Sequence, residues 1–339
     1  MLTSDQLKSH ALAMGWADKV GVANVERFED APPLMHPRAF MPNARSVVVF
    51  VKQLPRGPMR GIDEGTHWQS YSIFDYIHVN EMLVQSSYDI ACFIEDRGFE
   101  AAAVSGYATT QEAGPQRWPA TPEVDRPQAA LHCRISATLA GLGEIGWSKV
   151  FLTREFGPAQ RIGIVVTEAE LEPDPIRTGE LCDGCKRCVA ECPAGAIDSE
   201  RSVSIEVEGH RIEWNDLDLG KCKMCHHGLN RTNAPFLIKR YPGVYMPIEE
   251  QDVTWREAFD LGLALFRTVP GYASLAKQGI PAMCGARGCI VGCMKHLDRK
   301  GETERTYRTR KVFSEEKPWR LPPKPEKGHT DHRGFIYDV

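Results

Sequence analysis

The sequence predicts an α+β fold in which a front domain of helices and strands is followed by a cysteine-rich back half. Amphipathic stretches alternate with β-branched runs in the first half, whereas nine of the eleven cysteines fall between positions 182 and 293. The stretch Pro173–Pro175 marks the change of character. We therefore divide the chain into a front domain at residues 1–178, a cysteine-rich domain at 179–300 and an extended tail at 301–339.

The elements expected in the front domain follow from hydrophobic periodicity. In chain order they are a helix over 3–14, strands over 20–22 and 46–51, a helix over 77–97, a strand over 101–104, a helix over 131–139 and strands over 149–153 and 161–167. The run 46–51 is rich in valine, which is typical of a strand buried on both faces. Residues 106–128 are rich in Gly, Pro, Thr and Gln, so we expect a long irregular segment of the kind that often carries function.

Composition narrows the class of protein. The chain has 339 residues, of which 42% are hydrophobic and 25% are charged, as in ordinary globular proteins. Because 45 acidic residues nearly balance 41 basic ones, a nucleic-acid partner is not indicated. The sequence contains no apolar run long enough for a membrane span, and its start shows neither a signal-peptide pattern nor a twin-arginine pair. We expect a cytoplasmic protein without a membrane partner.

The most specific motif is Cys182-x2-Cys185-x2-Cys188-x3-Cys192, which is followed by Pro193. Its spacing matches the bacterial ferredoxin run, in which three thiolates hold one cubic iron–sulfur cluster and the fourth reaches a second cluster. A zinc site is the alternative, but zinc sites usually pair two CxxC units at a longer separation. The motif therefore predicts [4Fe–4S] clusters.

A second cysteine group follows later in the chain. Cys284-x4-Cys289-x3-Cys293 repeats the last spacing of the first motif, and Cys222-x2-Cys225 lies upstream. We assign to one cluster the thiols of Cys182, Cys185, Cys188 and Cys293. We assign to the other the thiols of Cys192, Cys284, Cys289 and either Cys222 or Cys225. His226 and His227, which follow Cys225, either complete a mixed Cys/His zinc site or line a polar loop.

A glycine motif lies between the predicted helix over 131–139 and the predicted strand over 149–153. Gly141-Leu142-Gly143-Glu144-Ile145-Gly146 fits the pattern GxGxxG. A dinucleotide site requires a strand before the motif and a helix after it, which is the reverse of the order expected here. The glycines would instead allow a flat or bulky ligand to lie against bare backbone.

These residues, taken together, resemble a known family. The chain is similar to the cobalamin-dependent reductive dehalogenases and to epoxyqueuosine reductase at several positions ahead of Cys182. These positions are 140–146, Leu152-Thr153, 156–158, Arg161, Thr167 and 171–174. The likeness is firmest over 131–198 and extends more loosely to the start of the chain. The chain departs from the family where Trp147-Ser148-Lys149 replaces a basic residue directly after the third glycine, and Asp125-Arg126-Pro127 only approximates an Asp-x-x-Pro stretch.

The resemblance implies a nitroreductase-like front domain that holds a base-off cobalamin and a ferredoxin-like domain with two [4Fe–4S] clusters. It also implies a reductase that cleaves a carbon–halogen or carbon–oxygen bond of a small molecule, with reduced ferredoxin, flavodoxin or a reductase as electron donor. The alternatives are an epoxyqueuosine reductase-like enzyme of tRNA modification, an iron–sulfur electron carrier without corrinoid, and a nitroreductase-type flavoenzyme with attached clusters. The substrate and the oligomeric state stay open.

Candidate residues for this chemistry lie in the front domain. Tyr107 is our first choice for the proton donor, because a phenol suits proton donation in a dry pocket, and Asp125 and His132 are the alternatives. Lys149 and Arg161 are candidates for binding an anion or a corrinoid side chain. The residues expected to contact the corrinoid are Gly141, Leu142, Gly143, Glu144, Gly146 and Arg161.

Overall fold

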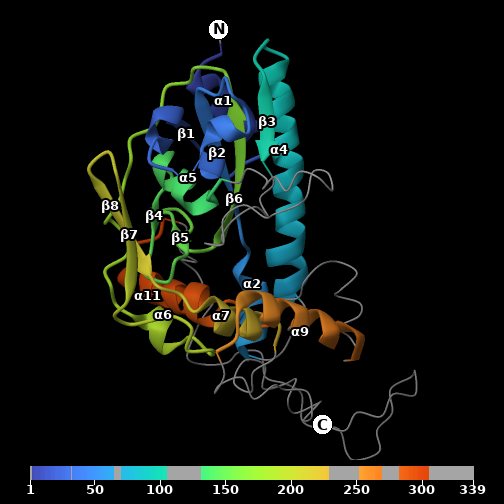
Figure 1. Cartoon of the computed structure of the whole chain (residues 1–339), viewed down its shortest axis with the longest axis vertical. Helices are drawn as coiled ribbons and strands as arrows, with labels where there is room; N and C mark the ends of the chain where they lie inside the picture. The colour runs from blue at the N-terminus through green and yellow to red at the C-terminus, as the bar shows by residue number, and fades with distance from the viewer. Residues whose placement is uncertain are drawn as a thin grey trace, which may run out of the picture.

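The computed structural model describes residues 2–31, 33–64, 70–104, 131–228, 252–268 and 282–304. A four-stranded antiparallel sheet forms the centre of the front half, with its strands in the order β1-β2-β6-β3 (Figure 1). These strands are β1 (Lys19–Asn24), β2 (Ser46–Gln53), β6 (Gln160–Thr167) and β3 (Ala101–Val104). The mixture of helices and strands expected from the sequence is therefore present.

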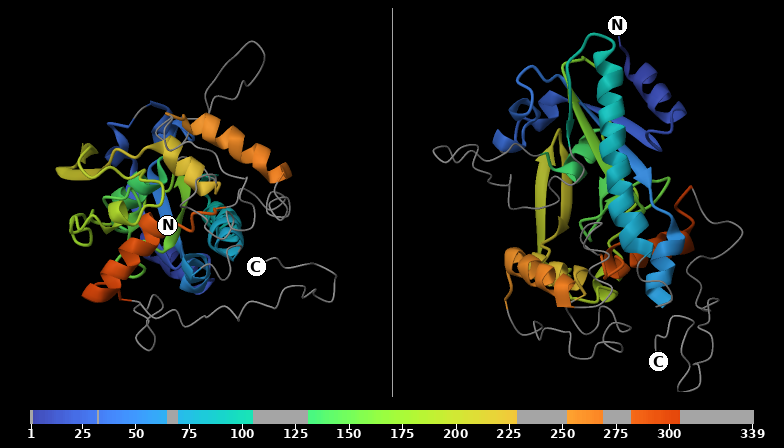
Figure 2. Two further views of the ribbon diagram at one scale, coloured as in Figure 1. Left: turned by 90° about the horizontal axis from the view of Figure 1, so that it is seen from below. Right: turned by 90° about the vertical axis from the view of Figure 1, so that its right-hand side faces the viewer.

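Strand β2 is buried on both faces, as its valine-rich sequence predicts, and it separates two hydrophobic cores. Val47, Val49 and Val51 face a first core that includes helix α5 (Cys133–Leu139). Val48 and Phe50 face a second core with helices α1 (Ser4–Ala13) and α4 (Val79–Glu95) (Figure 2). This alternation follows from the two-residue period of a strand.

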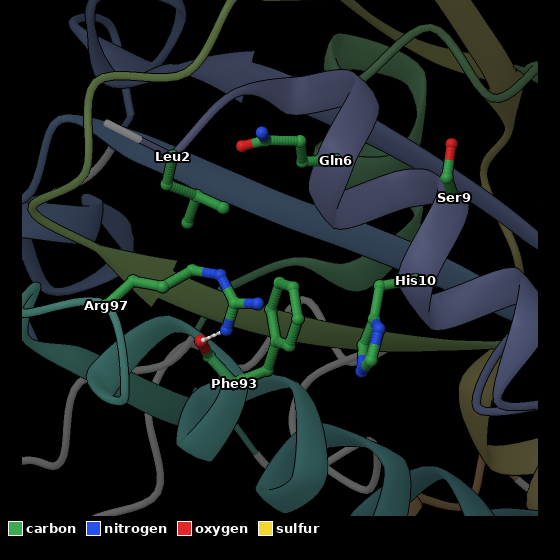
Figure 3. A pocket seen from close by; sticks show the side chains of 6 residues that line it. All are labelled: Leu2, Gln6, Ser9, His10, Phe93 and Arg97. Atoms are coloured by element: carbon green, nitrogen blue, oxygen red, sulfur yellow. Dashed lines mark hydrogen bonds between the residues drawn. The ribbon is translucent and has the colours of Figure 1, made fainter.

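Helix α1 begins at a capping box, in which the Thr3 hydroxyl and the Gln6 side chain each accept a backbone N–H of the other residue. Its last turn packs on α4 through the ring of Phe93. His10 stacks on that ring at 4.1 Å, and the guanidinium of Arg97 lies 3.4 Å from the ring centroid. These side chains line a surface hollow (Figure 3), which lies at the opposite end of the molecule from the helices of the cysteine-rich half.

The long helix of the front half begins earlier than periodicity predicts. A π-helix, η4 (Tyr71–His78), runs directly into α4, and helix α2 (Arg56–Glu64) precedes it. A π-helix carries more than 3.6 residues per turn, so its buried positions fall out of the usual helical pattern. The prediction of a helix over 77–97 therefore located α4 and missed η4.

Short elements follow β1 and surround the glycine motif. Three 3-10 helices follow β1, namely η1 (Val25–Phe28), η2 (Pro33–Met35) and η3 (Pro37–Ala39). Strands β4 (Glu144–Ile145) and β5 (Phe151–Leu152) form a small ladder that is shorter than the strand expected over 149–153. Lys149 at the turn between them has a left-handed backbone with φ of 62°.

The described residues of the cysteine-rich half include a hairpin and several helices. The hairpin pairs β7 (Ser202–Val207) with β8 (His210–Asn215) through a turn in which Glu208 and Gly209 both have positive φ. The helices are α6 (Arg187–Ala190), α7 (Leu219–His226), α9 (Trp255–Thr268), the π-helix η5 (Arg287–Gly292) and α11 (Cys293–Lys300). None of the helices in the described ranges has the length and apolar character to cross a bilayer.

The two halves share their hydrophobic cores. Trp214 of the hairpin packs into the first core of the sheet. A third core joins Leu54 and Met59, from the end of β2 and from α2, to Ile290 and Met294 of the last two helices. The cysteine-bearing helices are therefore held directly against the front half.

Candidate functional site

Four of the predicted cluster ligands line one cavity. Its walls include the side chains of Cys182, Cys185, Cys188 and Cys293, which we call the first thiol group. Cys293 begins α11, whereas the other three lie in and just before α6. Four thiols around one cavity are the donor set that a cubic [4Fe–4S] cluster requires. The chemistry of the donors therefore fits such a cluster, and ligation itself stays a prediction.

Glu144 holds the backbone at the start of this group. One carboxylate oxygen accepts the main-chain N–H groups of Leu181 and Cys182 at 3.0 and 2.6 Å, and the other accepts that of Glu180 at 2.7 Å. The N–H of Trp147 donates to the sulfur of Cys182 at 3.3 Å. The glycine motif, the residue after it and the cysteine motif are thus joined directly. The cofactor contact that the sequence analysis expects for Glu144 stays a prediction.

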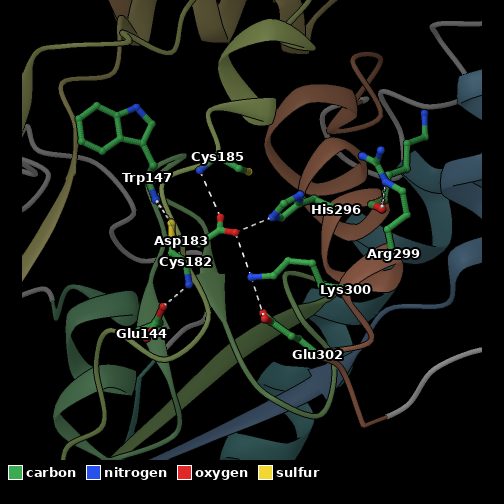
Figure 4. A network of polar contacts seen from close by, with 10 residues as sticks. Glu144, Trp147, Cys182, Asp183, Cys185, His296, Arg299, Lys300 and Glu302 are labelled. Atoms are coloured by element: carbon green, nitrogen blue, oxygen red, sulfur yellow. Dashed lines mark hydrogen bonds and ion pairs between the residues drawn. The ribbon is translucent and has the colours of Figure 1, made fainter.

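A charged network ties α11 to the loop of the first thiol group (Figure 4). The carboxylate of Asp183 contacts the imidazole of His296 at 2.8 Å and the ammonium of Lys300 at 3.0 Å. Burial opposes ionisation of Asp183, but the hydrogen bonds from His296 and Lys300 outweigh it and lower the pKa of this carboxyl. Because Cys293 lies on the same helix as His296, the network also fixes the position of the fourth thiol.

The other five predicted cluster ligands interact with one another, and we call them the second thiol group: Cys192, Cys222, Cys225, Cys284 and Cys289. The thiols of Cys225 and Cys284 are hydrogen-bonded to each other. Cys289 interacts electrostatically with Cys192, Cys222 and Cys284. The structure thus brings together the predicted set and both of its alternative members. Four thiols suffice for a cluster, so the choice between Cys222 and Cys225 stays open.

Close backbone packing brings the two groups together. A Cβ on Gly288 of η5 would lie 2.6 Å from the Cα of Cys192 and 2.9 Å from the carbonyl oxygen of Cys188. Only glycine allows the chain that carries Cys289 to approach the chain that carries Cys188 and Cys192 so closely. The first and second thiol groups therefore lie on adjacent backbone segments.

The two histidines after Cys225 have different surroundings. The Nδ1 atom of His226 lies 4.0 Å from the sulfur of Cys284. The ring of His227 is buried against α9, where a Cβ on Gly262 would lie 1.9 Å from its Nδ1 atom. Burial lowers the pKa of both imidazoles. His226 contacts the second thiol group, and His227 packs between helices.

A buried polar cluster in the front half faces the second thiol group, and we call it the Arg161 site. The Arg161 guanidinium donates to the Tyr71 hydroxyl at 3.0 Å and to the main-chain oxygen of Asp75 at 3.3 Å. It also lies 4.8 Å from the ring centroid of Tyr76, whose ring is 5.1 Å from that of His226. A continuous series of contacts therefore leads from Cys284 through His226 and Tyr76 to Arg161.

Asp75 is the unusual member of this site. Its side chain is fully buried, and neither carboxylate oxygen has a hydrogen-bond partner in the part of the chain that the structure describes. Burial raises the pKa of this carboxyl to about 8, against the opposing pull of Arg161. The sequence analysis selected Arg161 but missed Tyr71, Asp75 and Tyr76. An aspartate within the apolar stretch 71–79 was the available signal.

The other residues that the sequence analysis selected for catalysis lie apart from the Arg161 site or outside the described residues. Tyr107 and Asp125 lie outside the described residues. Lys149 is buried, which lowers the pKa of its ammonium to about 8, and its Nζ lies 5.9 Å from the ring centroid of Trp214. His132 caps α5, where its Nδ1 accepts the N–H of Ile135 at 3.2 Å.

The glycines of the motif meet the chain's own backbone. A Cβ on Gly141 would lie 2.4 Å from the carbonyl oxygen of Pro175, and one on Gly143 would lie 2.0 Å from that of Leu152. A Cβ on Gly146 would meet the Leu152 side chain at 2.9 Å, and Leu142 itself is buried in the first core. This packing explains the glycines without a ligand, and their contact with a corrinoid stays a prediction.

Comparisons with known proteins agree with the cysteine chemistry. The model of a 4Fe-4S binding domain matches residues 178–198. A tetrachloroethene reductive dehalogenase of Desulfitobacterium hafniense is 31% identical over 168 residues, which are 48% of this chain and 25% of that protein. An epoxyqueuosine reductase of Listeria monocytogenes is 31% identical over 71 residues, 21% of this chain and 18% of that protein.

The solved structure of epoxyqueuosine reductase from Streptococcus thermophilus aligns with a TM-score of 0.46 at 15% identity, covering 88% of this chain and 85% of that chain. The sequence matches cover a quarter or less of the two relatives' own length. The chain thus carries an iron–sulfur domain. It is related in sequence to the reductive dehalogenases and the epoxyqueuosine reductases, which confirms the resemblance seen in its motifs.

Proposed function

We propose that this protein is a reductase that passes electrons through two [4Fe–4S] clusters to a base-off cobalamin and reductively cleaves a carbon–halogen or carbon–oxygen bond. The observation that carries the proposal is the arrangement of nine cysteines in two adjacent groups, the second of which is linked to the Arg161 site through His226. The two relatives named above, a dehalogenase and a reductase, support the same class of reaction.

Electrons enter at the first thiol group. Cys182 and Cys185 are exposed, so a reduced ferredoxin, a flavodoxin or a reductase can approach a cluster held there. Cys225 of the second group is buried, and this group faces the front half instead. Gly288 packs against the segment that carries Cys188 of the first group and Cys192 of the second, and this packing would keep the two clusters adjacent, which short-range electron transfer requires.

The Arg161 site offers the groups that a corrinoid needs in order to bind. The carboxyl group of Asp75 is buried without a hydrogen-bond partner among the described residues, and the amide side chains of a corrinoid can supply one. Asp75, Tyr76 and Arg161 would hold the cofactor on the side of the second thiol group. When bound, cobalamin supplies a strongly nucleophilic low-valent cobalt, while the protein supplies binding and electrostatics.

The reaction also needs an anion site and a proton. Two electrons and one proton replace the leaving group, which departs as an anion. Arg161 stabilises this anion by its charge. Burial raises the pKa of Tyr71, so its phenol keeps its proton at neutral pH beside Arg161. Tyr107 stays the first candidate for the proton donor, with Asp125 and His132 as alternatives, and Lys149 is a second candidate cation.

The test is cofactor identification followed by turnover. Anaerobically reconstituted protein is incubated with cobalamin, separated from free cofactor and examined by visible spectroscopy and iron analysis. Retained corrinoid, together with reductive loss of halide from halophenols or cleavage of alkoxyarenes, supports the proposal. Clusters alone would indicate an electron carrier, and bound flavin would indicate a nitroreductase-type enzyme. Turnover only of an epoxyqueuosine-containing RNA stem loop would favour the RNA-modifying alternative.

A further inference from the structure

The three residues that follow the glycine motif, Trp147-Ser148-Lys149, contact both thiol groups. The N–H of Trp147 donates to the sulfur of Cys182 in the first group at 3.3 Å (Figure 4). The hydroxyl of Ser148 donates to the main-chain oxygen of Cys289 in the second group at 3.4 Å. Lys149 comes next, with the left-handed backbone described above. This turn therefore carries a lysine to the place where the two groups meet.

Lys149 brings a positive charge into the interior. Its side chain is buried, and its Nζ atom lies 5.9 Å from the ring centroid of Trp214. The ammonium interacts electrostatically with Asp216 and with Cys222 of the second thiol group. Asp216 is exposed and pairs with Arg201 at 3.6 Å, so solvent screens its charge. A buried charge is screened much less, and Lys149 therefore acts strongly on an anion held by Cys222.

Lys223 brings a second positive charge to the same group from helix α7. It follows Cys222 directly in sequence, and its ammonium interacts electrostatically with the thiols of Cys222 and Cys284. Its Nζ atom lies 5.3 Å from the ring centroid of Trp255 and 5.2 Å from that of Phe259, both in α9. Aromatic faces attract cations, so the two rings help to hold the ammonium beside the thiols.

The charge of an iron–sulfur cluster explains what these lysines can do. A [4Fe–4S] cluster held by four thiolates is an anion, and reduction makes it more negative. The protein sets its reduction potential through nearby charges, hydrogen bonds to sulfur and exposure to solvent. Burial around Cys225 disfavours the added negative charge, whereas a nearby cation favours it. Arg134, which also interacts with Cys222, is a third cation at this group.

We propose that Lys149 and Lys223 raise the reduction potential of the second cluster and thereby favour the passage of electrons from the first cluster to the second. In each such step the first cluster loses one electron and the second gains it, and the external donor then reduces the first again. The inference rests on the proposed function, since it requires both clusters. It deepens that function by naming the residues that direct electrons inward, and it needs neither corrinoid nor substrate.

The experiment is a redox titration of the full-length protein, reconstituted anaerobically with iron and sulfide and reduced stepwise with dithionite at neutral pH. Visible absorption and low-temperature EPR follow the two reduction waves. The wave of the second cluster is the one that disappears in whichever of the variants Cys222→Ser and Cys225→Ser lacks that cluster. Iron analysis of each sample shows that both clusters are present before their potentials are compared.

Methionine variants remove the charges and keep the length of the side chain. We expect Lys149→Met and Lys223→Met each to shift the second wave to a more negative potential, and the double variant to shift it further. An apolar side chain in place of a buried charge is usually tolerated, so Lys149→Met should fold. Lys223→Arg keeps the charge and should keep the wild-type potential.

The matched control is Lys8→Met, because Lys8 lies in α1, at the opposite end of the molecule from the cysteine-bearing helices (Figure 1). It should leave both waves in place. A second wave that is unchanged in both Lys149→Met and Lys223→Met, at full iron content, would overturn this inference alone. An equal shift in Lys223→Arg and Lys223→Met would overturn it too, because charge would not be the cause. Wild-type protein without a second cluster would overturn it together with the proposed function.

Discussion

The carboxylate of Glu144 accepts the main-chain N–H of Cys182 at 2.6 Å, together with those of the two preceding residues. Glu144 belongs to the glycine motif, and Cys182 is the first residue of the cysteine motif. A charged acceptor strengthens each of these hydrogen bonds and lets three backbone donors share one side chain. The contact fixes where the first thiol group begins.

Replacing Glu144 by Gln tests this anchor. The amide keeps one acceptor oxygen but directs an N–H₂ group at a backbone donor, so at least one hydrogen bond is lost. Hydrogen bonds to charged groups contribute about 1.5–3 kcal/mol each. We expect Glu144→Gln to lose iron to a chelator several-fold faster than wild type. Glu180→Gln is the control, because the Glu180 side chain pairs with Arg154 on the surface. Equal rates in the two variants would contradict the anchoring role.

Serine variants of Cys222 and Cys225 separate the two candidates for the fourth ligand of the second cluster. Both cysteines interact with Cys192 and Cys284, and Cys222 also interacts with Cys289. We expect Cys222→Ser to reduce iron from roughly eight to roughly four per chain and Cys225→Ser to retain it. Iron analysis after anaerobic reconstitution decides the assignment. The reverse pattern would make Cys225 the ligand. Full iron content in both variants would show that neither Cys222 nor Cys225 is needed as a ligand.

The close approach of η5 to Cys192 predicts a steric effect. In Gly288→Ala the new methyl group would lie 2.6 Å from the Cα of Cys192, so one backbone segment must move. Overpacking of this kind costs about 1–3 kcal/mol. We expect a lower thermal midpoint by circular dichroism and a lower iron content. Gly57→Ala is the matched control, because Gly57 lies in α2 with open space around it, and alanine should be neutral or stabilising there. Wild-type behaviour of Gly288→Ala would disprove this packing.

We expect the free energy of unfolding to depend on pH because of the buried carboxyl group of Asp75. Its folded-state pKa, about 8, lies above its ordinary value of 3.8 because the carboxyl is buried. The protonated carboxyl therefore makes its full contribution to the free energy of unfolding below about pH 4. This contribution is lost as the pH rises through 8. Asp75→Asn stays neutral throughout. We expect the variant to match wild type near pH 4 and to melt at a higher temperature at pH 8.5.

The comparison in that experiment is Glu29→Gln, an exposed acidic residue. This variant should follow the wild-type melting curve at both pH values. A melting difference between Asp75→Asn and wild type that does not change with pH would show that the Asp75 carboxyl does not titrate in this range.

Much of the front half could be predicted because its signals are local. The valine run of β2 and the periodicity of α4 record burial within a few neighbouring residues. The spacing also led to the grouping of Cys293 with Cys182, Cys185 and Cys188, which line one cavity. In the ferredoxin pattern the last cysteine of each motif ligates the cluster that the other motif holds. The β7–β8 hairpin was missed although Val203, Ile205 and Val207 alternate before a Glu-Gly turn.

Contacts between distant segments could not be predicted. The cofactor contact expected for Glu144 stays a prediction, but no local pattern indicates its hydrogen bonds to residues 180–182, about 36 residues later. The Arg161 site joins a π-helix to the first residues of β6, and no local pattern links Tyr71 to Arg161 across 90 positions.

The central claim is that two adjacent thiol groups hold two cubic clusters, and it is tested most directly by metal analysis combined with low-temperature EPR. The protein is reconstituted anaerobically and reduced with a low-potential donor. The account predicts roughly eight irons per chain, no zinc and a spectrum broadened by interaction between two reduced [4Fe–4S] clusters. Four irons with the signal of one isolated cluster, or stoichiometric zinc in place of iron, would contradict it.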